Sequence, residues 1–195
     1  MKRIPAAWLI LAIASAMIAF APAVLAQEEH GEVGVFADMT RLHHLNNDNF
    51  WGIGGRLGFN MNHWVALEGD FAYDFSQQFA APSGTTLTTN TIGNLRLLQG
   101  MAGPKFQTGI GPVKAFVVLK GGFMNFGVSG ISGLAFRNQV GNVPAGNTDG
   151  VFYPGAGVEF FAGRIGLRAE VGDEMYFDNG ANHNLKISVG PQFRF

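Results

Sequence analysis

The sequence predicts an all-β protein, a closed antiparallel up-and-down barrel of eight strands that crosses a membrane. Three observations predict this class. Apolar and polar residues alternate with a period of two in eight segments, as in strands whose successive side chains point to opposite faces. The connections between these segments are alternately long and short. Charged residues are sparse and gather on one face of each segment, opposite an apolar face.

The N-terminal segment is predicted to be a cleaved signal peptide, residues 1–26. A short basic start precedes an apolar run, and the small residues Val24 and Ala26 occupy the −3 and −1 positions of a cleavage site. An uncleaved membrane anchor is the alternative, but Pro22 and the small residues favour cleavage. Residues 27–195 then form one outer-membrane β-barrel domain, and the chain leaves the cytoplasm.

Composition excludes several classes of protein and site. The sequence contains no cysteine, which rules out disulfides and thiolate ligands. The formal net charge of −1, with no cluster of lysine and arginine beyond the first residues, predicts no nucleic-acid partner. After the leader, no apolar run is long enough for a membrane-spanning helix. No pattern predicts a cofactor.

The eight alternating segments follow one another along the mature chain. They cover about 32–42, 50–61, 64–75, 92–106, 113–128, 151–161, 165–177 and 184–195. Long polar connections follow the odd-numbered segments, and short turns follow the second, fourth and sixth. Long loops at one end and tight turns at the other are typical of barrels in the bacterial outer membrane.

The charged face of these strands is predicted to point into the barrel. A soluble barrel would turn the apolar face inward around a ligand, whereas a membrane barrel turns it toward lipid. Sparse charges of nearly balanced sign favour the membrane form. An eight-stranded barrel is narrow enough for side chains to fill it, so these charges are expected to form a buried network rather than line a channel. The predicted lumenal network comprises Asp38, Arg56, Glu68, Asp70, Lys105, Lys114, Lys120, Glu159, Arg168, Glu170, Lys186 and Arg194.

Aromatic residues gather near the strand ends, as in the interfacial girdles of membrane barrels. Two such belts, one at each membrane interface, are expected to face outward. The predicted girdle residues are Trp51, Trp64, Phe75, Phe106, Tyr153, Phe160 and Phe177.

No arrangement of residues predicts catalysis or metal binding. Ser188 and His183 lie five residues apart on one strand, roughly 16 Å, which is too far for a hydrogen bond. No G-x-S-x-G motif occurs. His43, His44 and Asp48 fall in or beside the first long connection, where a solvated loop is the simpler interpretation than a metal site. We expect no enzyme activity and no metal.

The connections after the third and fifth segments are the places where binding is expected. They are rich in Ser, Thr, Asn, Gly and Ala, and the second also carries Leu134, Phe136 and Val140. Binding residues are commonly held on loops by a rigid scaffold. The sequence does not identify the extracellular partner.

The mature chain resembles the small eight-stranded outer-membrane barrels: the OmpA transmembrane domain, OmpX and the opacity-type proteins. The resemblance rests on the eight segments, on "YPGAGVEFF" followed by "IGLRAEVGDEMYF", and on the terminal "ISVGPQFRF". It implies a monomer embedded in outer-membrane lipids of a Gram-negative-type bacterium. It also implies that the last strand, with Phe193 and Phe195, is the signal read by the barrel-assembly machinery. OmpA-like proteins often continue into a peptidoglycan-binding domain; this chain ends at the barrel, so no cell-wall anchoring is expected.

The resemblance implies a structural or surface-interaction role, such as adhesion or binding, through the extracellular loops. Three alternatives stay open at this point. They are a narrow porin-like channel for ions or small solutes, a lipid-modifying outer-membrane enzyme, and a soluble periplasmic barrel that binds a ligand.

Overall fold

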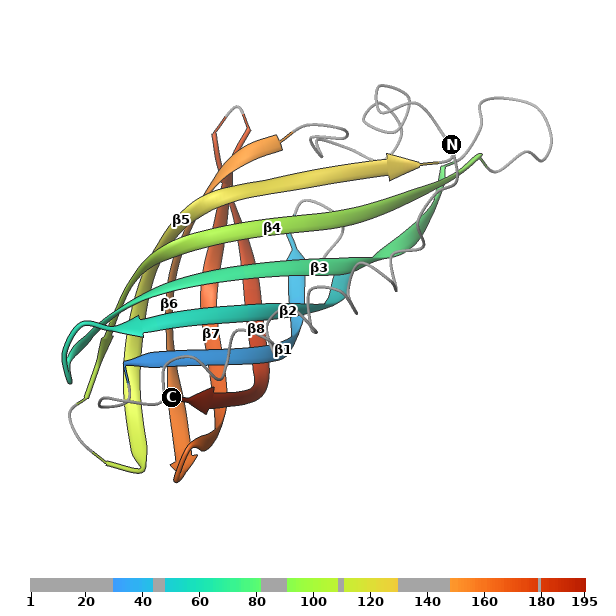
Figure 1. Ribbon diagram of the computed structural model, residues 1–195. Helices are drawn as coiled ribbons and strands as arrows, with labels where there is room; N and C mark the ends of the chain where they lie inside the picture. The colour runs from blue at the N-terminus through green and yellow to red at the C-terminus, as the bar shows by residue number, and fades with distance from the viewer. Residues whose placement is uncertain (1–29, 44–47, 82–90, 109–110, 130–147, 179) are drawn as a thin grey trace, which may run out of the picture.

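The protein is a single closed barrel of eight antiparallel strands, each paired with its neighbours in sequence (Figure 1). The computed structural model describes residues 30–43, 48–81, 91–108, 111–129, 148–178 and 180–195. The strands are β1 (Gly31–Leu42), β2 (Asp48–Asn60), β3 (Val65–Ala81), β4 (Thr91–Gln107), β5 (Val113–Ser129), β6 (Thr148–Ala162), β7 (Ile165–Phe177) and β8 (Ala181–Arg194). The predicted fold class is therefore confirmed. Within the described ranges, no helix is long and apolar enough to cross a membrane.

The barrel closes where β8 pairs with β1. The seam continues to the last residue, because Gly31 N donates to Phe195 O (3.0 Å) and Phe195 N donates to Gly31 O (2.9 Å). Hydrocarbon offers no water to unpaired backbone groups, so a spanning sheet must close in this way. The final strand is thus part of the wall rather than a loose end.

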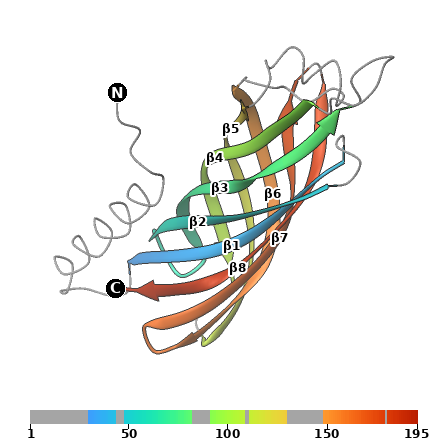
Figure 2. The same cartoon turned by 90° about the vertical axis from the view of Figure 1, so that its right-hand side faces the viewer.

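The three central strands β3, β4 and β5 are the longest, with 17 residues each. They reach well beyond β1 and β2 at the end of the barrel that carries the long connections (Figures 1 and 2). The sequence predicted that the third strand ends at Phe75, but it continues to Ala81. A register shift between Asp74 and Gln77 interrupts the pairing with β4. Such a bulge breaks the period-two pattern, so alternation could not reveal the continuation.

The two faces of the wall have opposite character. Leu57, Val117 and Leu167 are at least half exposed on the outside, whereas Lys105 and Lys120 are fully buried inside. A water-soluble barrel would arrange these residues the other way round. The outer face is therefore suited to lipid, and the lumen is polar over most of its length.

Glycines in the wall leave room for aromatic rings in the lumen. The Tyr153 ring lies over Gly155 and Gly172, and a Cβ at Gly172 would lie 2.6 Å from that ring. Phe116 lies over Gly157 in the same way, 2.4 Å from where a Cβ would be. A larger residue at these positions would displace the ring, so the glycines are required by close approach rather than by backbone conformation.

Candidate functional site

Arg168 is the centre of the buried charge network inside the barrel. Its guanidinium donates to both carboxylate oxygens of Glu68 across the lumen, at 2.6 and 2.9 Å. It also donates to Glu159 Oε1 (2.8 Å) and to Glu170. The side chain is 2% exposed. Glu159 is the direct cross-strand partner of Arg168, so the register of β6 and β7 brings these two together.

Three further cations extend this network around the lumen. Lys105 Nζ lies 3.0 Å from Glu32, 3.1 Å from Glu68 and 2.9 Å from Glu159. Lys120 Nζ lies 2.6 Å from Asp70 and 3.2 Å from Glu68. Arg56 contacts Asp70 (2.7 Å) and Glu170 (3.3 Å). Each carboxylate thus meets at least one cation, as buried charges require.

A second charged cluster lies around Lys186. Its Nζ is 3.2 Å from Asp38 and 3.3 Å from Glu174, and it also donates to the Gln99 side-chain oxygen. Gln99 in turn donates to Asp74 Oδ2 at 2.8 Å. Three carboxyl groups, those of Asp38, Asp74 and Glu174, therefore lie around this one lysine.

The long-connection end of the lumen is apolar instead of charged. Phe126 and Tyr176 meet edge to face with ring centroids 5.2 Å apart. The residues that fill this end are Leu42, Phe50, Leu95, Leu97, Met124, Phe126, Val151 and Tyr176, all buried. At the same level the outer face carries polar residues such as Arg96 and Asn125. This end of the barrel therefore has the polarity of a protein surrounded by water.

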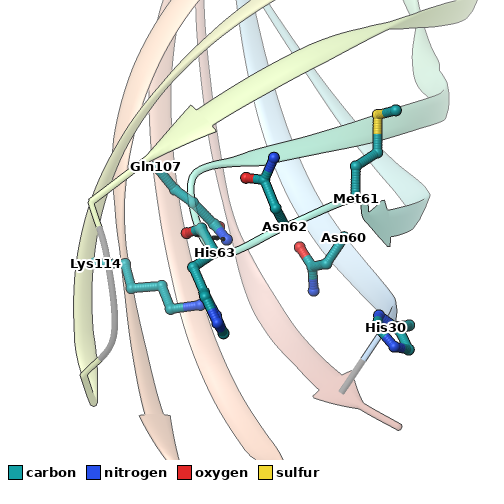
Figure 3. A pocket seen from close by; sticks show the side chains of 7 residues that line it. All are labelled: His30, Asn60, Met61, Asn62, His63, Gln107 and Lys114. Carbon is teal, nitrogen blue, oxygen red and sulfur yellow. Dashed lines mark hydrogen bonds between the residues drawn. The ribbon is translucent and has the colours of Figure 1, made fainter. Parts of the chain in front are cut away.

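The short-turn end opens into a pocket of about 400 Å³ (Figure 3). Its lining residues are His30, Asn60, Met61, Asn62, His63, Gln107 and Lys114. Arg194 belongs to the same end and stacks its guanidinium 3.2 Å from the centroid of the Phe161 ring. Basic residues thus predominate at this mouth of the barrel.

Comparison with known families identifies the chain. Residues 11–193 match the family described as "Outer membrane protein beta-barrel domain". The chain belongs to this family. It is an outer-membrane protein whose apolar outer face contacts membrane lipids, which makes the soluble periplasmic alternative wrong. No curated protein matches the chain significantly.

Two solved structures illustrate the shared fold of this outer-membrane barrel. Ail, the attachment invasion locus protein of Yersinia pestis, crystallised with the heparin analogue sucrose octasulfate, is 16% identical with a TM-score of 0.53; the match covers 85% of this chain and 96% of that one. Neisserial surface protein A is 13% identical with a TM-score of 0.62, and covers 85% and 97%. At these identities the likeness concerns the fold alone.

The structure places all twelve predicted lumenal charges of this outer-membrane barrel inside the wall, each at most 8% exposed. Ten of them share salt bridges within 4 Å; Arg194 stacks on an aromatic ring, and Lys114 lies at the pocket. The list predicted from the sequence did not include Glu32, Asp74 and Glu174. Glu32 belongs to the network around Arg168, and Asp74 and Glu174 belong to the Lys186 cluster. Each lies an even number of residues from a predicted lumenal charge on its own strand, so strict alternation would have found them.

Six of the seven predicted girdle residues face outward and are at least 43% exposed: Trp51, Trp64, Phe75, Phe106, Phe160 and Phe177. The assignment of Tyr153 to a girdle was wrong, because its side chain is 1% exposed inside the lumen. Tyr153 lies six residues from Glu159 on an unbroken strand, and both therefore point the same way. The odd or even position of a residue in its strand therefore predicts the direction of its side chain better than its nearness to a strand end does.

The other predicted features of this outer-membrane barrel are placed only in part. Phe193 is 37% exposed, and its ring stacks on that of Phe195 with centroids 6.5 Å apart. The predicted signal peptide, His44, and the loop residues Leu134, Phe136 and Val140 lie outside the described residues.

Proposed function

We propose that this outer-membrane barrel is a surface-binding protein whose long-connection end contacts an extracellular partner. The observation that carries the proposal is the sheet formed by the ends of β3, β4 and β5. Beyond Phe75 on β3, Leu98 on β4 and Phe123 on β5, the outward residues become polar. A spanning strand needs about 9–11 residues, and each of these strands has 17. The excess length would raise a polar platform above the lipid.

The interior of this raised part supports a rigid platform. Leu95 and Leu97 of β4 are fully buried, as are Met124 and Phe126 of β5. Such an apolar core beneath a polar outer face stabilises a sheet in water. Binding loops are commonly held by a scaffold of this kind.

A structural or binding role also agrees with the contents of the lumen. Charged side chains fill its middle, and the apolar cluster described above fills the end toward the long connections. Small barrels whose interior is occupied by side chains are not expected to conduct. We therefore favour binding over transport for this chain.

The composition of the long connections indicates what kind of partner they suit. Residues 43–47, 82–90, 130–147 and 178–180 contain a single lysine or arginine, Arg137. The Yersinia pestis protein was crystallised with a polysulfated sugar, whose charge calls for several basic residues. The composition of these connections, rich in Ser, Thr and Asn and including Leu134 and Phe136, favours a protein or uncharged glycan surface as the partner.

The test is adhesion of an expressing strain to wells coated with extracellular-matrix glycoproteins. One variant replaces residues 130–147 with a two-residue turn, and a second does the same for 82–90. Adhesion is expected to fall to the level of the non-expressing strain in at least one variant. Both variants must keep wild-type surface amounts and the gel shift on boiling that marks a folded barrel. A third variant combines both replacements, and full adhesion by this variant would refute the proposal.

A further inference from the structure

The pocket at the short-turn end of the barrel lies apart from the proposed binding platform. It lies where the ends of β2, β4 and β5 meet His30, the residue just before β1 (Figure 3). Short turns of outer-membrane barrels face the periplasm. The pocket therefore opens on the opposite side of the membrane from the proposed binding platform.

Lys114 brings an uncompensated positive charge to this pocket. Its cross-strand neighbour on the inner face is Glu159. That carboxylate is instead engaged by Lys105 (2.9 Å) and Arg168 (2.8 Å) deeper in the lumen. Within the described part of the chain, Lys114 makes no hydrogen bond or salt bridge, although it is only 7% exposed.

The other charges near Lys114 do not restore the balance. Arg194 repels it electrostatically. The Glu32 carboxylate attracts it, but Glu32 accepts hydrogen bonds from Lys105 (3.0 Å) and from Asn60 Nδ2 (3.2 Å). The Lys114 ammonium therefore stands at the mouth with both nearby carboxylates, Glu32 and Glu159, engaged by other donors. An anion from outside the barrel would neutralise the mouth.

Three other lining residues, Met61, Asn62 and His63, belong to the turn between β2 and β3, whose backbone is held by hydrogen bonds. The Asn62 side-chain oxygen accepts from the backbone N–H groups of Trp64 (2.8 Å) and Val65 (2.9 Å). Gln107 Nε2 donates to the His63 carbonyl at 3.3 Å and so ties the turn to β4. Asn62 and His63 line the same pocket as Lys114, and their side-chain N–H groups are further hydrogen-bond donors there.

We propose that this pocket is a binding site for a phosphate-type oxyanion, with Lys114 as the main charge partner and the lining residues Asn62 and His63 as donors. An oxyanion with several acceptor oxygens suits a cation surrounded by separate donors. The same chemistry occurs in two periplasmic sources, the phosphate of an inner-leaflet phospholipid headgroup and a free phosphorylated solute.

The test is a titration with inorganic phosphate of the refolded protein in maltoside detergent, which itself contains no phosphate. Amide resonances of Asn62, His63 and Lys114 are followed by NMR. The wild type is expected to show a saturable shift. Lys114→Gln is expected to weaken binding at least about tenfold, equal to about 1.4 kcal/mol. Arg164→Gln is the matched control. Arg164 is exposed in the β6–β7 turn at the same end of the barrel but does not line the pocket. This control substitution is expected to change the affinity for phosphate less than about twofold.

Three outcomes would overturn the site: no saturable shift in the wild type, unchanged affinity in Lys114→Gln, or equal weakening in Arg164→Gln. Because Lys114 makes no ion pair with the described residues, its replacement is not expected to unfold the barrel. Boiling-dependent gel migration checks this, and His63→Gln provides a second variant that is expected to weaken binding.

Phosphatidylcholine nanodiscs without added phosphate distinguish the two sources. If the pocket resonances already lie at their phosphate-bound positions, a lipid headgroup occupies the site. If they lie at their free positions and move when phosphate is added, the site takes a soluble anion. Both results support the pocket as an oxyanion site, whereas resonances that respond to neither probe contradict it.

Discussion

Replacing Arg168 with methionine tests whether the lumenal charges hold the barrel together as one network. The substitution keeps an unbranched apolar side chain but removes the partner of Glu68, Glu159 and Glu170. Breaking a buried pair by deleting one partner typically costs about 3–5 kcal/mol. Here Lys105 still contacts Glu68 and Glu159 at 3.1 and 2.9 Å, and this residual pairing limits the loss. We therefore expect about 3 kcal/mol, a shift of roughly a hundredfold in the unfolding equilibrium.

The assay is guanidinium unfolding of the protein in lipid vesicles, followed by tryptophan fluorescence. Trp51 and Trp64 are both on the lipid-facing side, so their emission reports transfer from lipid to water. Arg168→Lys keeps the charge but loses the two-pronged contact with Glu68, and is expected to fall between wild type and Arg168→Met. The double variant Arg168→Met with Glu68→Gln is expected to be more stable than the sum of the two single losses suggests, since it no longer buries a Glu68 carboxylate that has lost its two-pronged contact with Arg168.

The reasoning would be refuted if Arg168→Met lost less than about 1 kcal/mol, the range of an exposed ion pair. It would also be refuted if the double variant lost the full sum, because the two side chains would then act independently.

Three further perturbations test other parts of the barrel. Gly172→Leu is expected to displace the Tyr153 ring and cost about 1–3 kcal/mol in the same unfolding assay, whereas Gly150→Ala, whose Cβ would meet nothing closer than 4.0 Å, is expected to be neutral. Deleting Phe195 removes the two hydrogen bonds that close the seam at Gly31, so less folded barrel is expected in outer-membrane fractions; wild-type amounts would contradict this. In planar bilayers the wild type is expected to give no steady conductance, and regular openings would show that the lumen is not filled.

The strand pattern in the sequence was enough to predict the architecture. Alternation of apolar and polar residues can be recognised in each strand by itself. Eight such strands, joined alternately by long loops and short turns, leave few alternatives to a closed membrane barrel. The same alternation placed Arg168, Glu68 and Lys120 inside, because only one face of each strand was charged. Where the alternation was followed less strictly, the prediction failed: Tyr153 was assigned to a girdle although it shares the parity of Glu159.

What the sequence could not determine is how the strands align with one another. Whether a residue has an odd or even position in its strand determines the face to which its side chain points. Its position along the barrel axis relative to residues of other strands depends on the register between the strands. The bulge between Asp74 and Gln77 likewise left no repeating pattern to read.

The sequence by itself determined the membrane location, the number of strands and the inward direction of the charges, because these depend on local periodicity. Only the tertiary structure decided which charges meet. Arg168 donates to Glu68, one hundred positions away in the chain. It also donates to Glu159, the cross-strand neighbour of Lys114. Closure of the wall and its register decide which charges pair, and they leave Lys114 at the short-turn mouth without a salt bridge to the described residues. That lysine, whose position the composition does not reveal, is the physical basis for the proposed oxyanion site.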